Sequence, residues 1–367
     1  MRKSASTALI AILLIAMLVT PLAAQDVPAA PAGPTTYLPF IGQGEGMLAA
    51  GRPIAQQGGG SSNNQDALIG PGVDQSYALV QLAGEPLATY EKTKPPQGKK
   101  IDFDKGETKN YRAQLAARRN EFKQWLRKNA PKARVTGEYD IALNAVSIQL
   151  NGTALEVIAA APMVTFAQYQ GLYYPMGSAE QVAVPDPDLS LIGLSNGDPN
   201  GGEGVKVAIV DSGIDQSHSC FNPAGYTAPA GFPRGQTQYT NAKVIVAKVF
   251  NNKLNQSGFD AKAVDSHGTH VAGTVACNYQ TPAKVDGVAI PYGISGVAPR
   301  AFLGNYNVFP GTVDDARAED ILNALDAAYA DGMDVANMSL GGPYHGVKDL
   351  LMIASDNFDQ AGMVVAI

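Results

Sequence analysis

The segment VKVAIVDSGID (residues 205–215) decides how this sequence folds. Residues 205–210 form a nearly continuous apolar run rich in β-branched side chains, which is typical of a parallel strand buried on both faces. The run ends at Asp211, and Gly213 frees the backbone for a turn. Open α/β sheets place their sites at the carboxyl ends of strands, so Asp211 is a candidate site residue. Taken alone, the segment also fits a structural aspartate in a turn.

Strand-like and helix-like segments alternate along the rest of the C-terminal half. Apolar runs predict strands near residues 243–250, 301–309, 335–340 and 363–367. Helices are expected after Ser266, over residues 321–332 with Gly332 as the closing residue, and over residues 347–361. This alternation predicts the α/β class, with a parallel sheet that has helices on both faces.

Two further motifs carry candidate chemistry. In DSHGTHVAGT (residues 265–274), Ser266 is placed to cap a helix and His267 lies in its first turn. Small residues that follow allow this helix to pack closely beneath a cleft. In NMSLGG (residues 337–342), the side chains become small at a strand end, so the backbone can hydrogen-bond an extended peptide. A satisfied core or surface histidine and an ordinary strand exit are the simpler readings of the two motifs.

In this order, the three motifs resemble those of the subtilase family of serine proteases. The segments GVAPRA (residues 296–301) and DGMDVANMSLG (residues 331–341) resemble the family as well. The resemblance implies that residues 201–367 are the N-terminal part of a subtilisin-like catalytic domain. It makes Asp211 the triad aspartate and His267 the general base of peptide-bond hydrolysis. It also implies that Ser339, Leu340 and Gly341 pair with the substrate backbone and line the main specificity pocket.

A smaller α+β module is predicted over residues 76–170. Strand-like segments at 77–82, on both sides of Asn144 and at 164–168 combine with a helix over 111–129 and a short helix after Thr153. The resulting order βαββαβ is ferredoxin-like. The segments YDIALNA (residues 139–145) and AAAPMV (residues 159–164) resemble inhibitor I9-type propeptides. That resemblance implies an intramolecular inhibitor, with a linker at residues 171–200 that contains the maturation site.

The N-terminus predicts export from the cell. A basic start, an apolar run over residues 8–20 and small residues before position 25 indicate a signal peptide over residues 1–24. A retained anchor is the alternative. Residues 25–75 are rich in Pro, Gly, Ala and Gln, which is typical of a flexible linker. We therefore expect a secreted protein with no stable membrane span once the signal is removed.

Charge and cysteine content narrow the candidate partners. The net charge of −6 disfavours nucleic acid as a partner. More than half of the 27 Lys and Arg lie between Lys92 and Arg134, where a solvated helix face accounts for them. Cys220 and Cys277 are compatible with a disulfide in an exported protein, and two free thiols fit the sequence nearly as well. Because the two cysteines follow the Asp and His motifs at similar distances, a bridge beside the cleft is one hypothesis.

The sequence departs from the family pattern in two respects. The family's catalytic serine and oxyanion asparagine are expected beyond residue 367, so we expect these 367 residues alone to be an inactive fragment of a zymogen. Cys220 stands where many members carry a calcium-binding aspartate, so no metal ligands or cofactors are assigned. Protein or peptide substrates are the expected partners. A non-catalytic protease inhibitor or pseudoprotease is the main alternative, whereas a nucleotide-binding enzyme would need a Gly-rich turn that residues 211–215 lack.

Overall fold

The computed structural model describes residues 72–176, 198–251, 258–285, 287–289, 291, 293–344 and 348–367. The chain divides into two compact units, Met1–Gly60 and Ser61–Ile367, and every described residue lies in the second. The predicted signal peptide, most of the first predicted linker and most of the second fall outside the described residues. No helix among the described residues is both long and apolar enough to cross a membrane.

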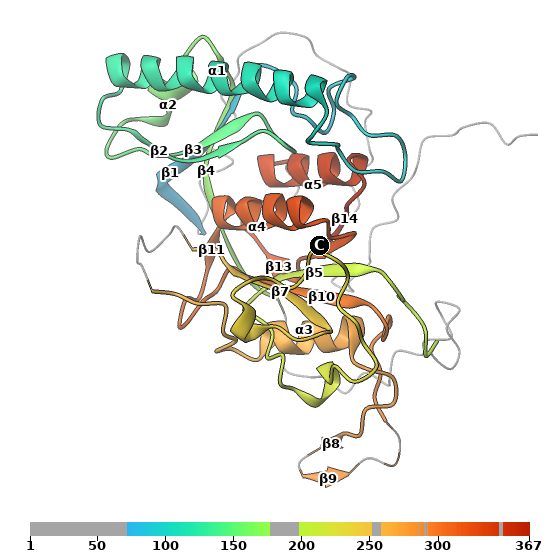
Figure 1. Ribbon diagram of the computed structural model, residues 1–367. Coiled ribbons are helices and arrows are strands. Elements are labelled where there is room, and N and C mark those ends of the chain that lie inside the picture. The colour runs from blue at the N-terminus through green and yellow to red at the C-terminus, as the bar shows by residue number, and fades with distance from the viewer. Residues whose placement is uncertain are drawn as a thin grey trace, which may run out of the picture. The chain divides into compact units, whose positions relative to one another are not determined.

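Residues 73–175 form the N-terminal module, an antiparallel sheet covered by helices (Figure 1). Its strands lie side by side in the order β4-β1-β3-β2. The observed chain order confirms the predicted βαββαβ arrangement. The elements are β1 (Val73–Leu82), α1 (Gly106–Asn129), β2 (Arg134–Tyr139), β3 (Ala145–Gln149), α2 (Leu155–Ala159) and β4 (Val164–Pro175).

Helix α1 has the predicted amphipathic character. Its buried apolar side chains are Tyr111, Leu115, Phe122 and Leu126, whereas most of its charged side chains are exposed. Arg119 is the exception, because its side chain is buried and lies 3.2 Å from a carboxylate oxygen of Glu138. The same guanidinium lies 3.1 Å from a carboxylate oxygen of Asp140, so the basic cluster is a solvated face with one buried arginine that pairs with two carboxylates.

The structure corrects three local expectations in this module. Residues 140–143 are not a strand, because the carbonyl groups of Asp140 and Ile141 accept hydrogen bonds from a loop at residues 87–88. Thr153 does not cap α2, which begins after Ala154 without a side-chain cap. Strand β4 continues to Pro175, so the first residues of the predicted linker at 171–200 are strand.

Residues 198–367 form the parallel-sheet module. Its strands have the order β14-β12-β5-β10-β7-β6, and β5 occupies the centre. Helices α4 and α5 lie on one side of this sheet and α3 lies on the other (Figure 1). The main elements are β5 (Lys206–Asp211), β7 (Val244–Val249), α3 (His267–Ala276), β10 (Phe302–Asn307), α4 (Ala318–Asp331), β12 (Val335–Asn337), α5 (Leu350–Gln360) and β14 (Val364–Ala366).

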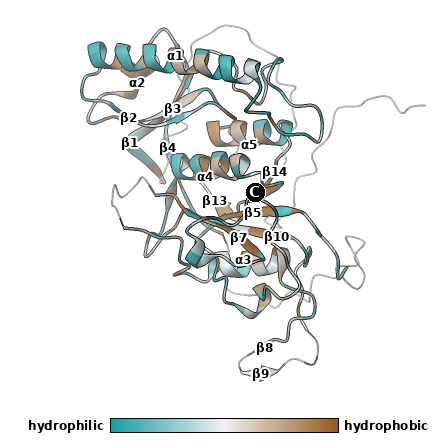
Figure 2. Cartoon of the chain, in the orientation of Figure 1, coloured by the Kyte–Doolittle hydropathy of each residue, from teal (hydrophilic) through white to brown (hydrophobic). Residues whose placement is uncertain are grey.

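The sequence pattern accounts for this architecture. Hydrophobic residues concentrate on the central strands (Figure 2), and the side chains of residues 207–210 are all buried. Gly332 ends α4 in the left-handed conformation, with φ of 86°, as predicted. The shorter elements are η3 (Ser219–Phe221), β6 (Arg234–Gly235), η4 (Thr237–Tyr239), β8 (Lys284–Val285), β9 (Val288–Ala289), β11 (Ala316–Arg317) and β13 (Leu340–Gly341).

Candidate active site

Asp211 and His267 meet at the carboxyl end of β5. Asp211 is the last residue of this strand and is fully buried. Its Oδ1 lies 2.8 Å from Nδ1 of His267, the first residue of α3. The same Oδ1 accepts a hydrogen bond from the backbone N–H of Ser212 at 2.6 Å. The structure thus brings together the two residues that sequence reasoning singled out for acid–base chemistry.

Small residues allow the two motifs to approach. A Cβ on Gly268 would lie 2.4 Å from the carbonyl oxygen of Gly213, so a side chain there would collide with backbone. The Ser212 hydroxyl accepts a hydrogen bond from the Gly268 N–H at 2.9 Å. This contact holds the start of α3 against the turn that follows β5.

The helix start differs from the expectation in one detail. Ser266 makes no side-chain capping bond, although it occupies the N-cap position of α3. Oδ1 of Asp265 instead accepts the His267 N–H at 2.7 Å. A carboxylate at a helix N-terminus also interacts favourably with the helix dipole. Capping by Asp265 was open to sequence reasoning because aspartate is as good a cap as serine.

The segment 339–341 pairs with the end of the N-terminal module. Strand β13 runs antiparallel to β4, and Leu340 lies opposite Pro175 while Gly341 lies opposite Tyr174. The N–H of Met176 donates to the carbonyl oxygen of Ser339 at 2.9 Å. The predicted peptide-binding segment therefore pairs with residues 174–176 of the same chain, at the end of the six-residue stretch 171–176. We call these six residues the tail.

Met176, the last residue of the tail, contacts the side chain of His267. Its carbonyl oxygen lies 2.7 Å from Nε2 of His267. The sequence contained no signal for this contact, since no local pattern relates residue 176 to residue 267. The physical consequence is that both ring nitrogens of His267 face oxygen acceptors.

The electrostatics of the pair follow from burial and these hydrogen bonds. Burial raises the pKa of Asp211, and the hydrogen bonds from His267 and the Ser212 N–H only partly offset it. Burial lowers the pKa of His267, but the hydrogen bonds with Asp211 and the Met176 carbonyl outweigh it and the pKa is raised overall. A histidine between two acceptors is stabilised as the imidazolium.

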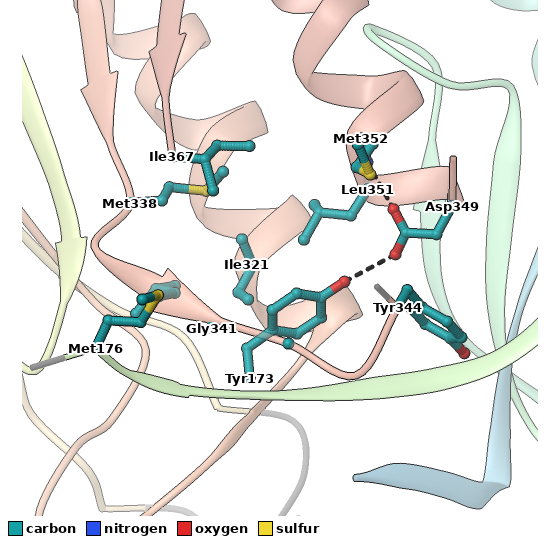
Figure 3. A pocket seen from close by; sticks show the side chains of 12 residues that line it. Tyr173, Met176, Ile321, Met338, Gly341, Tyr344, Asp349, Leu351, Met352 and Ile367 are labelled. Atoms are coloured by element: carbon teal, nitrogen blue, oxygen red, sulfur yellow. Dashed lines mark hydrogen bonds between the residues drawn. The ribbon is translucent and has the colours of Figure 1, made fainter. Parts of the chain in front are cut away.

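A cavity of about 450 Å³ adjoins the tail and β13. Figure 3 shows Tyr173 and Met176 of the tail beside it, with Asp349 close to the phenol of Tyr173. We call it the Asp349 pocket. Neither Tyr173 nor Asp349 was singled out from the sequence. Its lining residues are Tyr173, Met176, Ile321, Met338, Leu340, Gly341, Gly342, Tyr344, Asp349, Leu351, Met352 and Ile367.

Cys220 and Cys277 form a disulfide, which confirms one of the two alternatives left open by the sequence. The bond joins η3 to the residue that follows α3. Cys220 is therefore committed to a covalent bond at the position where calcium-binding relatives are expected to carry an aspartate. No group of three or more His, Cys, Asp or Glu among the described residues is placed to hold a metal ion.

The fold and this site together define a class of protein. A parallel α/β sheet that carries a hydrogen-bonded Asp–His pair at its strand ends has the geometry that a serine hydrolase needs for acid–base chemistry. Residues 202–367 match the model of the subtilase family. This part of the chain is therefore similar to subtilisin-like serine proteases.

Individual relatives agree with the family match. The chain is 34% identical to subtilisin-like protease SBT2.1 of Arabidopsis thaliana over 161 residues, which cover 38% of this chain and 19% of that protein. It is 29% identical to subtilisin E of Bacillus subtilis (strain 168) over 227 residues, which cover 61% of this chain and 48% of that protein. The chain thus spans less than half the length of these two relatives.

A solved structure was also found to be similar. Fervidolysin from Fervidobacterium pennivorans, described as a keratinolytic enzyme related to subtilisin, is 18% identical with a TM-score of 0.46. The superposition covers 80% of this chain and 40% of that one.

Proposed function

We propose that the whole protein is a secreted, subtilisin-like serine endopeptidase made as a zymogen. In this proposal His267 is the general base, and Asp211 accepts its Nδ1 proton and stabilises the imidazolium. The mechanism also needs a nucleophilic serine and an oxyanion donor. The single observation that supports the proposal best is the Asp211–His267 hydrogen bond at the end of β5.

The N-terminal module acts as the intramolecular inhibitor in this proposal. Its support is the pairing of β4 with β13, which lays the tail along the segment predicted to bind substrate. The alignment with subtilisin E covers 61% of the chain, more than residues 202–367 alone, so it extends into the part before residue 202. Residues 1–24 would direct export and be removed.

The register of the tail points to one maturation bond. The carbonyl oxygen of Met176 lies beside Nε2 of His267. The base activates the nucleophile at this nitrogen, so the carbonyl carbon of a scissile bond must lie close to it. We therefore assign cleavage to the bond between Met176 and Gly177, within the interval expected from the sequence. After cleavage the tail would stay in place as a bound product, because its strand pairing does not depend on that bond.

The experiment uses the complete gene product that contains these residues. We expect casein hydrolysis, and a mature protein whose N-terminal sequence begins Gly-Ser-Ala-Glu from residue 177. His267→Ala abolishes both activity and cleavage. His270→Ala is the matched control, because this histidine is exposed on the same helix and should leave activity intact.

Two results would contradict the proposal. Undiminished casein hydrolysis by the His267→Ala protein would remove the mechanism. A complete protein that degrades nothing but inhibits an added subtilisin would instead favour the non-catalytic inhibitor.

A further inference from the structure

Asp349 places a buried carboxylate beside the tail. Asp349 is only 2% exposed. Its two carboxylate oxygens have different hydrogen-bond partners. Oδ1 accepts the N–H of Met352 at 2.9 Å and so caps α5. Oδ2 accepts the phenol O–H of Tyr173 at 2.8 Å (Figure 3). One oxygen thus caps α5 and the other accepts a hydrogen bond from the tail, and the Gln168 side chain and the Leu351 N–H also stabilise the ionised carboxylate.

The surroundings of the Tyr173 ring suit an aromatic side chain. A Cβ on Gly342 would lie 2.3 Å from Cε1 of Tyr173, so the ring packs directly on glycine backbone. Apolar side chains of Ile321, Leu340 and Leu351 line the same pocket. The pocket thus combines apolar walls with one buried hydrogen-bond acceptor.

The strand register gives Tyr173 a defined place in a substrate. It is the fourth residue before the Met176–Gly177 bond, counting Met176 as the first. The neighbouring Tyr174 does not line the Asp349 pocket and is 43% exposed. Of these two tail residues, the Asp349 carboxylate therefore contacts residue 173 and not residue 174.

We infer that Asp349 is a specificity-determining residue that selects tyrosine as the fourth residue before the cleaved bond of a substrate. The inference rests on the proposed function, because it assumes that substrates follow the tail's path. When the tail leaves, Oδ2 of Asp349 loses the phenol as a donor, while the Gln168 side chain and the Leu351 N–H remain near the carboxylate. A peptide with tyrosine at the corresponding position restores the hydrogen bond, whereas phenylalanine leaves the buried carboxylate with one donor fewer.

Tyrosine suits the pocket better than a basic residue does. A lysine or arginine would also donate to Asp349, but its charge would have to be desolvated between apolar walls. Asp349 is the only carboxylate among the pocket's described lining residues, and its Oδ1 is already used by α5. A neutral O–H on an aromatic ring satisfies the free oxygen without that cost.

The first test measures hydrolysis by the activated whole protein. The substrates are p-nitroanilides of acetyl-Tyr-Tyr-Pro-Met and of its variants with Phe or Arg at the first position. We expect kcat/KM to fall about tenfold to a hundredfold on the change from Tyr to Phe, as for a lost hydrogen bond to a charged group. Phe at the second position is the control, with kcat/KM nearly unchanged.

The enzyme variant for this test is Asp349→Ser. Serine keeps a helix-capping oxygen and removes the oxygen that faces the phenol, so α5 retains its cap. The preference for Tyr over Phe should disappear in this variant. Equal rates for Tyr and Phe with the unmodified enzyme, or a higher rate with Arg, would overturn the inference.

A second test needs no catalytic activity. In the 367-residue chain, Tyr173→Phe should lower Tm by roughly 2–8 °C, whereas the matched Tyr174→Phe should not. On the Asp349→Ser background, Tyr173→Phe should have almost no effect. An equal loss in both backgrounds would overturn the inference. If this coupling is found but the whole protein hydrolyses no peptide, the proposed function fails and recognition of tyrosine by the pocket stands.

Discussion

Nε2 of His267 lies 2.7 Å from the carbonyl oxygen of Met176. Because Nδ1 of the same ring faces Oδ1 of Asp211, both nitrogens must donate for both contacts to be hydrogen bonds. The ring is then an imidazolium, which has no lone pair with which to accept a serine proton. The bound tail would thus block the cleft and also hold the proposed base in its inactive protonation state.

The first prediction concerns the pKa of His267. It should lie above the usual histidine value while the tail is bound, and Asp211→Asn should lower it because the carboxylate is lost. The tail-bound state binds the extra proton, so its stabilisation is present at low pH and is lost as pH rises through the raised pKa. Nitrogen chemical shifts of the His267 ring, followed by NMR from pH 5 to 9, measure this. An unshifted or lowered pKa would contradict the imidazolium assignment.

The second prediction uses two glycines of α3. Gly268→Ala should destabilise the chain by about 1–3 kcal/mol, because its methyl group would press on the Gly213 carbonyl. Gly273→Ala is the matched control, since nothing lies within 4 Å of its added Cβ. It should stabilise the helix by roughly 0.5–1 kcal/mol. Thermal unfolding of both variants measures these stability changes. Equal changes in stability for the two variants would show that the Gly268–Gly213 contact leaves room for a methyl group.

The third prediction concerns the Cys220–Cys277 disulfide. It closes a loop with a sequence separation of 57, so its loss should cost on the order of 4 kcal/mol by the loop-entropy model. Tm should fall on reduction, and a Cys220→Ser/Cys277→Ser double variant should lose a similar amount. The double variant must also be insensitive to reductant. Finding two free thiols in the native, unreduced protein would contradict the bond.

The fourth prediction concerns Asp326 on α4. Burial, with Asp140 of the N-terminal module as a second cause, raises the pKa of Asp326 to about 8, and Arg112 and Arg119 oppose this. The folded chain therefore binds more protons than the unfolded chain between about pH 4 and pH 8. Stability from this group is present at acidic pH and is lost as pH rises through about 8.

Asp326→Asn should remove this dependence, because asparagine resembles the protonated carboxyl group and cannot ionise. The Tm of the variant should exceed that of the unmodified chain at pH 8, and the difference should shrink toward pH 4. A difference that grows toward acidic pH would contradict the assignment. Asp356→Asn, on the exposed face of α5, is the control and should show little change.

Local patterns in the sequence were sufficient for the main helices and strands and for the two members of the Asp–His pair, although not for every element boundary or helix cap. The apolar run before Asp211 depends only on burial of consecutive residues, and the end of α4 at Gly332 depends only on the left-handed conformation of one glycine. Parallel strands align their carboxyl ends, so residues placed there by local pattern converge at one edge of the sheet.

Only the tertiary structure decided which distant groups pair. Tyr173 and Asp349 are 176 residues apart, and the local sequence around neither residue predicts a contact with the other. The same holds for the cysteine bond, for the register of β4 against β13, and for the Met176 carbonyl at His267. These contacts depend on how two separately patterned modules pack, because periodicity and turn chemistry act over a few residues and packing acts across the whole fold.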